Sequence, residues 1–419
     1  MWHLTDEQSA LRDKARGVVL DEIRPRVLEH ADCSDYPADL FDLLAREHLL
    51  GLTVPRAYGG GGETEVGALT VIEELAKVSG TVSLMAAYVT LTSLPILVAG
   101  SEEQKRRVLP TLCDGSQLGS YAVSEPDVGS DPAGLQTTAV RHGDTWILNG
   151  RKRFIGNSTM ADIFVVFART GGAGAGGLSA FLVDGHAPGV SAEPLRTMGM
   201  PGWQLGAPHF EDVEVPAQDM LGREGDGFRV AMATFDRSRP TVAAQSVGIA
   251  QGAVDLAMDY ASRRYSFGHP LLEHQAVSFT LAALEAEIAA ARALTFQAAS
   301  AIDEGTSGLT KLASMAKLMA SNVAMRATTE AVQVLGGNGY LKDFPAERMM
   351  RDAKVLQIYE GANEIQKLVI ARQMRHEAAD RDPVWPECMP GTHGIADGQR
   401  HPPSSDAARE RQSDGAAVV

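Results

Sequence analysis

One carboxylate near the C-terminal end of this 419-residue chain stands where a helical pattern breaks. Glu360 follows Tyr359 and precedes Gly361, and helix-compatible residues flank all three. Glycine in such a place indicates a break between two helices. The break lets the carboxylate leave the helix surface and point into a cavity, where desolvation makes it a stronger base. The alternative is an ordinary surface Glu at a helix end.

Three other places in the chain carry side chains that suit an anionic ligand with a flat ring. Gly129 and Ser130 offer unobstructed backbone N–H groups and a hydroxyl in a loop, where a phosphate fits. Arg264 and Ser266 offer a cation and a donor for phosphate, and Phe154 offers an aromatic face. Each also has a plainer interpretation, as a turn, a solvated charge or a core ring.

A glycine motif in the middle of the chain is misleading. Gly172, Gly174 and Gly177 match the G-x-G-x-x-G pattern of dinucleotide sites. Such a site needs a helix next, with the phosphate at its N-terminus, whereas residues 178–183 have the composition of a strand. We therefore interpret the glycines as a hairpin loop.

The composition excludes several classes of partner. The formal net charge of -15 disfavours nucleic acid and anionic membranes. Cys33, Cys113 and Cys388 are far apart, odd in number and without metal-binding spacing, which indicates a reducing compartment and no metal site. We find no signal-peptide pattern and no apolar run long enough to span a bilayer, and we therefore predict a soluble cytoplasmic protein.

The first part of the chain, residues 1–115, has an all-helical pattern. Capping boxes begin helices at Thr5 and Ser101, with glutamine three residues later in each case. Apolar residues at helical spacing predict further helices over 37–50, 63–78 and 82–99.

The pattern then changes to strands over residues 116–224. Short runs rich in β-branched and aromatic residues, separated by Gly, Pro and Asn, predict strands at 145–148, 163–167, 179–183 and 209–215. We predict a compact β-domain, such as a small barrel.

Helical patterns return over residues 225–379. Apolar stripes with steps of three and four cover 277–302 and 312–334, and helices are predicted near 242–264 and 347–375. This part should form an antiparallel four-helix bundle. Residues 380–419, rich in Pro, Gly, Ser, Asp and Arg, are predicted to be disordered. The fold class is therefore α+β multidomain.

The order of helices, small β-domain and helical bundle resembles the acyl-CoA dehydrogenase family over residues 4–376. Five local motifs carry the resemblance: the signature loop 121–131, the flavin-facing strand 149–157, the FAD pyrophosphate motif 264–268 with Gln275, the segment 333–340 that reaches a neighbouring subunit's FAD, and the base-carrying loop 357–366. The type implied is the medium- and short-chain one, with its glutamate in the C-terminal helical domain.

The resemblance implies which residues bind FAD and substrate. FAD contacts fall on Tyr121, Val123, Ser124, Gly129, Ser130, Phe154, Gly156, Arg264, Ser266, Phe267, Gln275, Gln333, Gly337, Ala362 and Glu364. Substrate contacts fall on Ser130, Phe235, Asp236, Arg239, Tyr359 and Gly361, with Phe235, Asp236 and Arg239 against the CoA portion. A structural ion pair is the alternative role of Arg239.

The reaction implied is α,β-desaturation of an acyl thioester. Glu360 removes the α-proton and flavin N5 accepts the β-hydride, while the backbone N–H of Glu360 and a ribityl hydroxyl stabilise the enolate-like oxygen. Some relatives place the base at the position of Ser238, whose hydroxyl cannot do that work, so the resemblance points to Glu360.

Two positions depart from the family pattern. Gly156 and Ala362 stand where relatives usually carry Thr, and the hydroxyl at the first position bonds flavin N5. Losing one such hydrogen bond costs about 1 kcal/mol. Weaker FAD binding, or a shift of the balance between dehydrogenase and oxidase, is the expected consequence.

The resemblance also implies partners. An electron-transfer flavoprotein is the expected electron acceptor, and the expected assembly is a homotetramer built as a dimer of dimers. The substrate is acyl-CoA, and the bulk of Met85, Tyr88 and Leu91 favours a short or branched acyl group. Three alternatives stay open: a carrier-protein-bound thioester, a flavin oxidase or monooxygenase, and a helical binding protein without chemistry.

Overall fold

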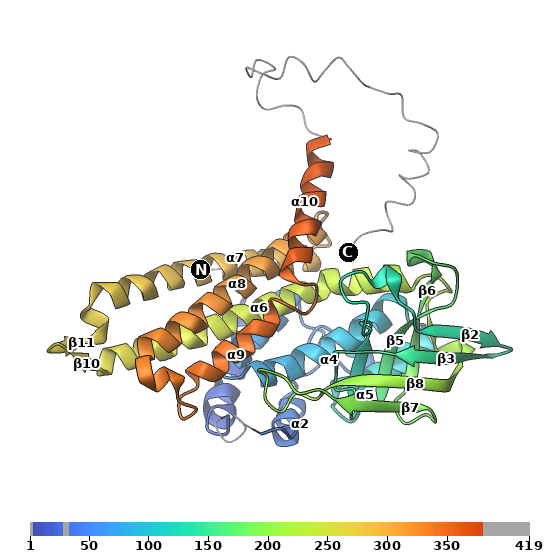
Figure 1. Ribbon diagram of the computed structural model, residues 1–419, viewed down its shortest axis with the longest axis horizontal. Helices are drawn as coiled ribbons and strands as arrows, with labels where there is room; N and C mark the ends of the chain where they lie inside the picture. The colour runs from blue at the N-terminus through green and yellow to red at the C-terminus, as the bar shows by residue number, and fades with distance from the viewer. Residues whose placement is uncertain (1–2, 28–32, 380–419) are drawn as a thin grey trace, which may run out of the picture.

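The computed structural model describes residues 3–27 and 33–379. The tail predicted to be disordered, residues 380–419, and Cys388 lie outside the described residues. Helices occupy most of the molecule, and the sheet lies at one end of it (Figure 1). The predicted order of helical, β and helical parts is confirmed.

The N-terminal part is helical, as predicted. Thr5 and Ser101 each accept the N–H of the residue three positions later, and both predicted capping boxes are complete. The elements are α1 (Asp6–Val18), the π-helix η1 (Val19–Ile23), α2 (Ala38–Arg46), the 3-10 helix η2 (Arg56–Tyr58), α3 (Glu65–Ala76), α4 (Gly80–Ala99) and α5 (Glu102–Cys113).

Helix α4 corrects one expectation from the sequence. By length and composition it is apolar enough to cross a membrane, although we predicted that no segment would be. It packs against α3 and α6, and 72% of its apolar window is buried inside the protein. The apolar run therefore belongs to a helix that is mostly buried in the protein core.

Among the described residues, nine strands form one sheet in the middle part. They are β1 (Gly119–Ala122), β2 (Thr138–His142), β3 (Thr145–Arg151), β4 (Ile155–Gly156), β5 (Ile163–Arg169), β6 (Leu178–Asp184), β7 (Val190–Pro194), β8 (Leu205–Pro216) and β9 (Met220–Leu221), joined in part by the short helices η3 (Pro132–Gly134), η4 (Ala175–Gly177) and η5 (Ala217–Asp219). The strand order is β4-β8-β3-β2-β5-β6-β9, with β1 parallel to β5 and β7 on β8.

All four predicted strands are present, and the misleading glycines lie in the β5–β6 hairpin. Strand β6 pairs antiparallel with β5 directly after the glycine loop, so the helix that a dinucleotide site needs is replaced by a strand. Strands β1, β2, β7 and β9 were not predicted, because they are short or exposed and lack a strong apolar pattern.

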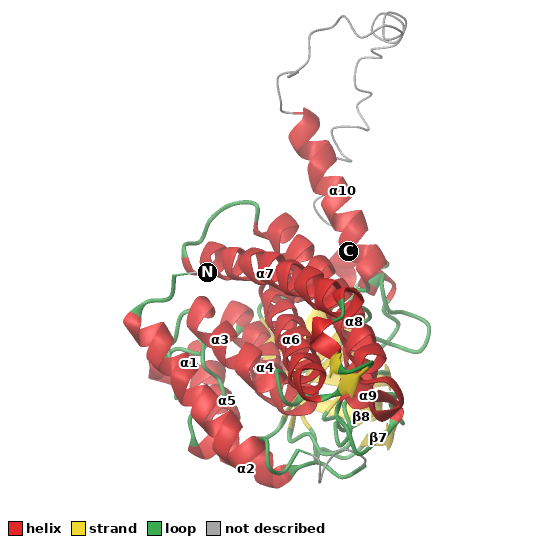
Figure 2. Cartoon of the chain, turned by 90° about the vertical axis from the view of Figure 1, so that its left-hand side faces the viewer, coloured by secondary structure: helices red, strands yellow, loops and turns green. Residues whose placement is uncertain are grey.

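The C-terminal part consists of long helices packed on one another (Figure 2). Its elements are α6 (Gly227–Arg263), the hairpin β10 (Tyr265–Ser266) and β11 (His269–Pro270), η6 (Leu271–Glu273), α7 (Gln275–Asp303), α8 (Leu309–Leu335), η7 (Gly336–Tyr340), α9 (Ala346–Leu356) and α10 (Asn363–Ala379). Helix α6 begins earlier than predicted and continues through Pro240. The helix predicted near 347–375 is divided into α9 and α10 by the turn that carries Glu360.

Candidate active site

Glu360 lies in a left-handed turn between α9 and α10. Its φ is +52° and that of Gly361 is +88°, a conformation that costs energy for a residue with a side chain. Gln366 Nε2 donates to the Glu360 carbonyl at 3.2 Å and to the Gly361 carbonyl at 2.9 Å. Lys317 Nζ also donates to the Gly361 carbonyl, at 2.8 Å. These donors hold the strained turn, and the predicted helix break is confirmed.

The carboxylate of Glu360 points toward α6. Ser238 Oγ donates a 2.6 Å hydrogen bond to Glu360 Oε2. Burial raises the pKa of Glu360, although the Ser238 hydrogen bond and the nearby cations Arg239 and Lys317 oppose the shift. A carboxylate with a raised pKa and one fixed oxygen has the properties of a general base.

Arg239 lies beside this carboxylate and is almost fully buried. Its Nη1 donates to Asp236 Oδ1 at 2.9 Å and to Ser314 Oγ at 3.3 Å. Thr310 Oγ1 donates to the other oxygen of Asp236 at 2.6 Å. The ion pair that we considered as an alternative therefore exists, yet Arg239 Nε has no hydrogen-bond partner among the described residues.

Three buried tyrosines respond to the charge of Glu360. Burial raises the pKa of Tyr88, Tyr121 and Tyr359, and the charge of Glu360 adds to the shift in each. The rings of Tyr121 and Phe235 meet edge to face at a centroid distance of 5.9 Å. The Tyr359 hydroxyl donates to Gln245, whereas the buried Tyr121 hydroxyl has no partner in the described part of the chain.

A buried ion pair positions the loop that carries Gly129 and Ser130. Glu125 accepts the N–H groups of Gln136 at 2.7 Å and Thr137 at 2.9 Å, and its Oε1 lies 2.9 Å from Lys152 Nζ. Lys152 Nζ also donates to the Val123 carbonyl at 2.9 Å, and the Arg153 N–H donates to the Ser124 carbonyl, again at 2.9 Å. The base of the loop is thereby fixed, while its tip is exposed.

The predicted flavin-facing residues Phe154 and Gly156 lie near this loop. Phe154 has a φ of +61° and is 59% exposed, which is unusual for a large aromatic side chain. Gly156 is buried at the end of β4. Ser120 Oγ donates to the Gly156 carbonyl at 2.7 Å and ties this strand to β1.

The predicted FAD contacts Ala362 and Glu364 follow Glu360 directly, where α10 begins. The remaining predicted FAD contacts gather at the other end of the helices. Arg264, Ser266 and Phe267 belong to the β10–β11 hairpin, far from the sheet in Figure 1. Gln275 begins α7 next to this hairpin. The predicted contacts Gln333 and Gly337 lie where α8 passes into η7, a segment that Asn338 ties to Tyr260 of α6 by a 2.9 Å hydrogen bond. Within a single chain, these residues therefore lie far from Glu360.

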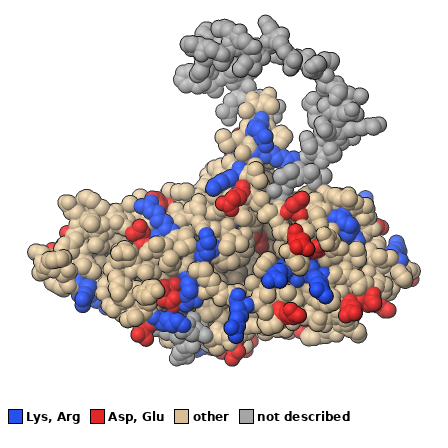
Figure 3. All heavy atoms as spheres, in the orientation of Figure 1, with Lys and Arg blue, Asp and Glu red and all other residues tan. Residues whose placement is uncertain are grey.

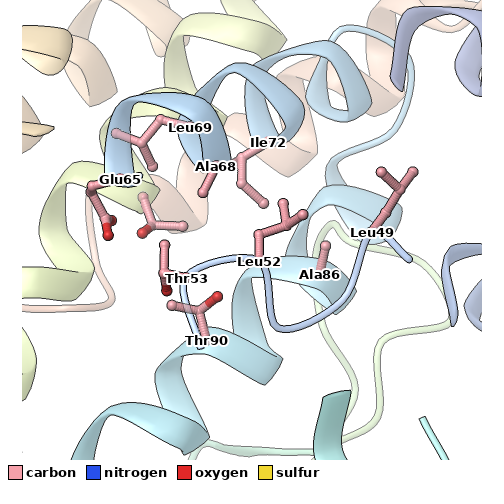
Figure 4. Close-up of a pocket in the computed structure, with 10 residues that line it drawn as sticks. Leu49, Leu52, Thr53, Glu65, Ala68, Leu69, Ile72, Ala86 and Thr90 are labelled. Atoms are coloured by element: carbon pink, nitrogen blue, oxygen red, sulfur yellow. The ribbon is translucent and has the colours of Figure 1, made fainter. Parts of the chain in front are cut away.

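A separate hollow lies between the segment before α3 and helices α3, α4 and α6 (Figure 4). Its polar lining residues are Glu65, Thr53, Thr90 and Thr241. Burial and the nearby Asp303 carboxylate raise the pKa of Glu65 to about 8. On α4, Ala86 and Thr90 line this hollow, and Tyr88 between them points to the other side of the helix. The hollow is therefore distinct from the surroundings of Glu360.

Three residues near Glu360 were missed or underused in the sequence analysis. Ser238 was considered only as a replaced base, and Tyr88 only as bulk, because neither contact has a sequence signature. Lys317 did have one, since it lies four residues after Ala313 and three before Ala320, which puts a charge on the buried face of α8. Burial lowers the pKa of Lys317 to about 7.

Known proteins resemble this chain over its N-terminal, middle and C-terminal parts. The family models for the N-terminal, middle and C-terminal domains of acyl-CoA dehydrogenases match residues 5–116, 120–213 and 225–375. An acyl-CoA dehydrogenase of Bacillus subtilis is 41% identical over 89% of this chain and 99% of the relative. Cyclohex-1-ene-1-carbonyl-CoA dehydrogenase of Geobacter metallireducens is 43% identical, with the same coverage of 89% and 99%.

Solved structures give the same result. Butyryl-CoA dehydrogenase of Megasphaera elsdenii has a TM-score of 0.86 at 40% identity and covers 90% of this chain and 100% of its own. A chain in the structure described as the electron transferring flavoprotein of Acidaminococcus fermentans has a TM-score of 0.86 at 38% identity, covering 89% and 99%. The prolyl acyl carrier protein oxidase AnaB has a TM-score of 0.84 at 28% identity, covering 89% and 100%.

The matches extend over all three parts of the chain and at identities far above those that show a fold alone. The order of helical, β and helical domains is therefore that of one known enzyme family. The chain belongs to the acyl-CoA dehydrogenase family, whose members are FAD-dependent oxidoreductases that act on CH–CH groups.

Proposed function

We propose that this protein desaturates a short or branched acyl-CoA, with Glu360 as the base that removes the α-proton. The observation that carries the proposal is the Glu360 carboxylate itself, held by Ser238 in a setting where burial raises its pKa. The α-proton of a thioester is only weakly acidic, so a base with a raised pKa lowers the cost of the transfer. Relatives that act on butyryl-CoA and cyclohexene-carbonyl-CoA support the choice of acyl group.

The turn also supplies a donor for the thioester oxygen. The backbone N–H of Glu360 has no acceptor among the described residues, and the left-handed turn fixes its direction. A preorganised N–H of this kind stabilises the negative charge that develops on the carbonyl oxygen as the α-proton leaves. Proton removal and charge stabilisation would then come from one residue.

The residues around the predicted cofactor site fit FAD. The buried, unpartnered hydroxyl of Tyr121 and the exposed face of Phe154 suit a flat ring with polar edges. No atom lies near the position of a Cβ on Gly129, so the loop has space for a phosphate. When bound, FAD supplies the hydride acceptor that these side chains lack.

The assembly that we propose is a homotetramer, built as a dimer of dimers, in which neighbouring chains complete each FAD site. Phe267 is 94% exposed and Tyr340 85% exposed, both at the end of the molecule that carries the second group of predicted FAD contacts. Charged side chains are sparse at this end in Figure 3 and denser over the sheet. An exposed apolar surface beside cofactor-binding residues suits contact with a second copy.

Electron-transfer flavoprotein is the acceptor that we propose, and the likeness to a chain from such a structure supports it. The likeness to AnaB favours a second candidate, in which the acyl group is carried by a carrier protein. Turnover measured with equal concentrations of a CoA ester and of the same acyl group on a carrier protein distinguishes the two candidate substrates. Peroxide formed in air at nearly the turnover rate would instead indicate an oxidase.

Two smaller proposals follow from the same resemblance. We place the domain boundaries at 1–115, 116–224 and 225–379, which the three matched ranges support. We also place the protein in the cytoplasm, in line with the isolated cysteines Cys33 and Cys113.

The test of the base is anaerobic bleaching of the flavin. The purified protein should be yellow and lose its flavin absorbance when butyryl-CoA is added without oxygen. Glu360→Gln should retain the yellow cofactor and fail to bleach, because an amide cannot accept the α-proton. Glu377→Gln, on an exposed part of α10, is the matched control and should bleach normally. Bleaching that survives Glu360→Gln would show that another group is the base.

A further inference from the structure

The turn that carries Glu360 rests on one fully buried, charged side chain of α8. Lys317 lies on the buried face of this helix, and its Nζ donates to the Gly361 carbonyl at 2.8 Å and to Asn363 Oδ1 at 3.0 Å. Gly361 directly follows Glu360, and Asn363 is the first residue of α10. The ammonium group therefore binds the turn on the C-terminal side of Glu360.

Hydrogen bonding by itself does not require an ammonium group at this place. Gln366 Nε2 also donates to the Gly361 carbonyl, at 2.9 Å, and Ser321 Oγ also donates to Asn363 Oδ1, at 3.1 Å. Both acceptors of Lys317 are therefore bonded by a neutral side chain as well. Each of them would keep a partner if the amine were removed, so neither would become a buried unpaired group.

A cation at this place costs free energy. Lys317 makes no salt bridge with a carboxylate in the part of the chain that the structure describes, and a buried charge without such a partner loses its hydration. The N-terminus of α10 adds to the cost, because a helix carries partial positive charge there. Of the charged groups around Lys317, Glu360 and Glu364 favour its ammonium form, whereas Arg239 on α6 opposes it.

The charge of Lys317 acts on Glu360 in return. Burial raises the pKa of Glu360, and the hydrogen bond from Ser238 is the largest effect against that shift. The charges of Arg239 and Lys317 also oppose it. A carboxyl group that is already protonated cannot accept an α-proton, so a cation beside the turn keeps more of the protein in the form that can.

We propose that Lys317 is a positioning residue for the base: its ammonium group binds the turn to α8, and its charge keeps the Glu360 carboxylate ionised. This inference rests on the proposed function, because it takes Glu360 as the base. It gives a buried lysine a reason that its hydrogen bonds do not give, since neutral side chains already bond the same acceptors.

The first experiment measures the pH dependence of kcat/KM with butyryl-CoA for the wild type, Lys317→Met and Lys317→Gln. Methionine removes the charge and the donors at similar length, whereas glutamine removes the charge and keeps an N–H donor. Both variants should fold, because each acceptor keeps another partner. In both, the acid limb should move to higher pH by about half a unit, which is less than the effect of an opposite charge in direct contact.

Lys311→Met is the matched control, because Lys311 lies on the same helix but pairs with Glu377 at 2.6 Å, away from the turn. Its acid limb should lie at the same pH as in the wild type. A wild-type limb in both Lys317 variants overturns the role of the charge, even where the melting temperature falls. A wild-type limb in Lys317→Gln together with a shifted limb in Lys317→Met assigns the effect to the hydrogen bond and also overturns that role.

The second experiment is an infrared titration of the holoenzyme, which follows Glu360 without turnover. The C=O stretch of the protonated Glu360 side chain is the band that Glu360→Gln lacks, and its midpoint should lie at higher pH in Lys317→Met than in the wild type. An unchanged midpoint overturns the inference about Lys317. Failure of the wild type to bleach with any acyl thioester overturns the proposed function instead, and the infrared midpoint still decides whether Lys317 controls the ionisation of Glu360.

Discussion

At the scale of single residues, the pKa of Glu360 is set by opposing neighbours. Burial favours the protonated acid, whereas the Ser238 hydroxyl and the cations Arg239 and Lys317 favour the carboxylate. The net shift is upward. A base must be deprotonated to act, so a raised pKa gains basicity only as long as the carboxylate is still populated at the working pH.

Ser238→Ala is expected to shift the pH dependence of catalysis. Removing the 2.6 Å hydrogen bond takes a donor from the carboxylate, and the pKa of Glu360 should rise further. The acid limb of kcat/KM should therefore move to higher pH, by about one unit for a charge-assisted hydrogen bond. Ser238→Thr keeps a hydroxyl, and its acid limb of kcat/KM should lie at the same pH as in the wild type. An acid limb that is the same in wild type and Ser238→Ala would contradict this view of Ser238.

At the scale of elements, one buried ion pair joins three segments of the proposed cofactor site. Glu125 binds the two N–H groups that follow η3, and Lys152, after β3, reaches both Glu125 and the Val123 carbonyl after β1. Burial lowers the pKa of Lys152 to about 8, although Glu125 opposes the shift. The pair therefore holds the loop base and the start of the Phe154 segment together.

Glu125→Ala should destabilise the protein by about 3–5 kcal/mol, since it leaves the Lys152 charge buried without a partner. The loop with Gly129 and Ser130 would lose its anchor, and less flavin should be retained after gel filtration. Urea unfolding and the flavin-to-protein absorbance ratio measure the two effects. The double variant Glu125→Leu/Lys152→Met should recover much of the stability, because no unpaired charge remains. A loss in the double variant as large as in Glu125→Ala would argue against the role of the pair.

At the scale of the whole molecule, the predicted FAD contacts form two groups. One group lies around Glu360 and the sheet, and the other lies at the β10–β11 hairpin and η7. Figure 1 shows the hairpin and the sheet at opposite ends of the folded molecule. A single FAD can touch both groups only if they come from different copies of the chain, so cofactor binding and assembly should depend on each other.

Phe267→Ser should weaken both assembly and FAD retention. The side chain is 94% exposed in the single chain, so its removal costs the folded protomer little. Light scattering should show smaller particles, and the protein should lose flavin on dilution. Val140→Ser, a 55% exposed position on β2 at the opposite end, is the control and should leave both unchanged. An intact flavin-loaded tetramer in Phe267→Ser would contradict this arrangement.

Features that depend on neighbours along the chain could be predicted from the sequence. Capping boxes at Thr5 and Ser101, four strands of the middle part and the helix break at Gly361 are local patterns of hydrogen bonding and spacing, and the structure has all of them. The resemblance predicts Glu360 as the base from a local pattern too, since its motif is continuous along the chain. Strands without an apolar pattern, such as β7, were outside the reach of this reasoning.

The surroundings of Glu360, in contrast, follow from tertiary packing alone. Ser238 reaches Glu360 from another helix, and Tyr88 of α4 packs on Gly156 of β4. The apolar helix α4 is a core helix because α3 and α6 pack against it. Contacts of this kind depend on which distant segments meet, and the apolar pattern of one segment does not identify the residues of another segment that will pack on it. The separation of the FAD contacts into two groups is likewise a property of three-dimensional distance, which residue types alone do not encode.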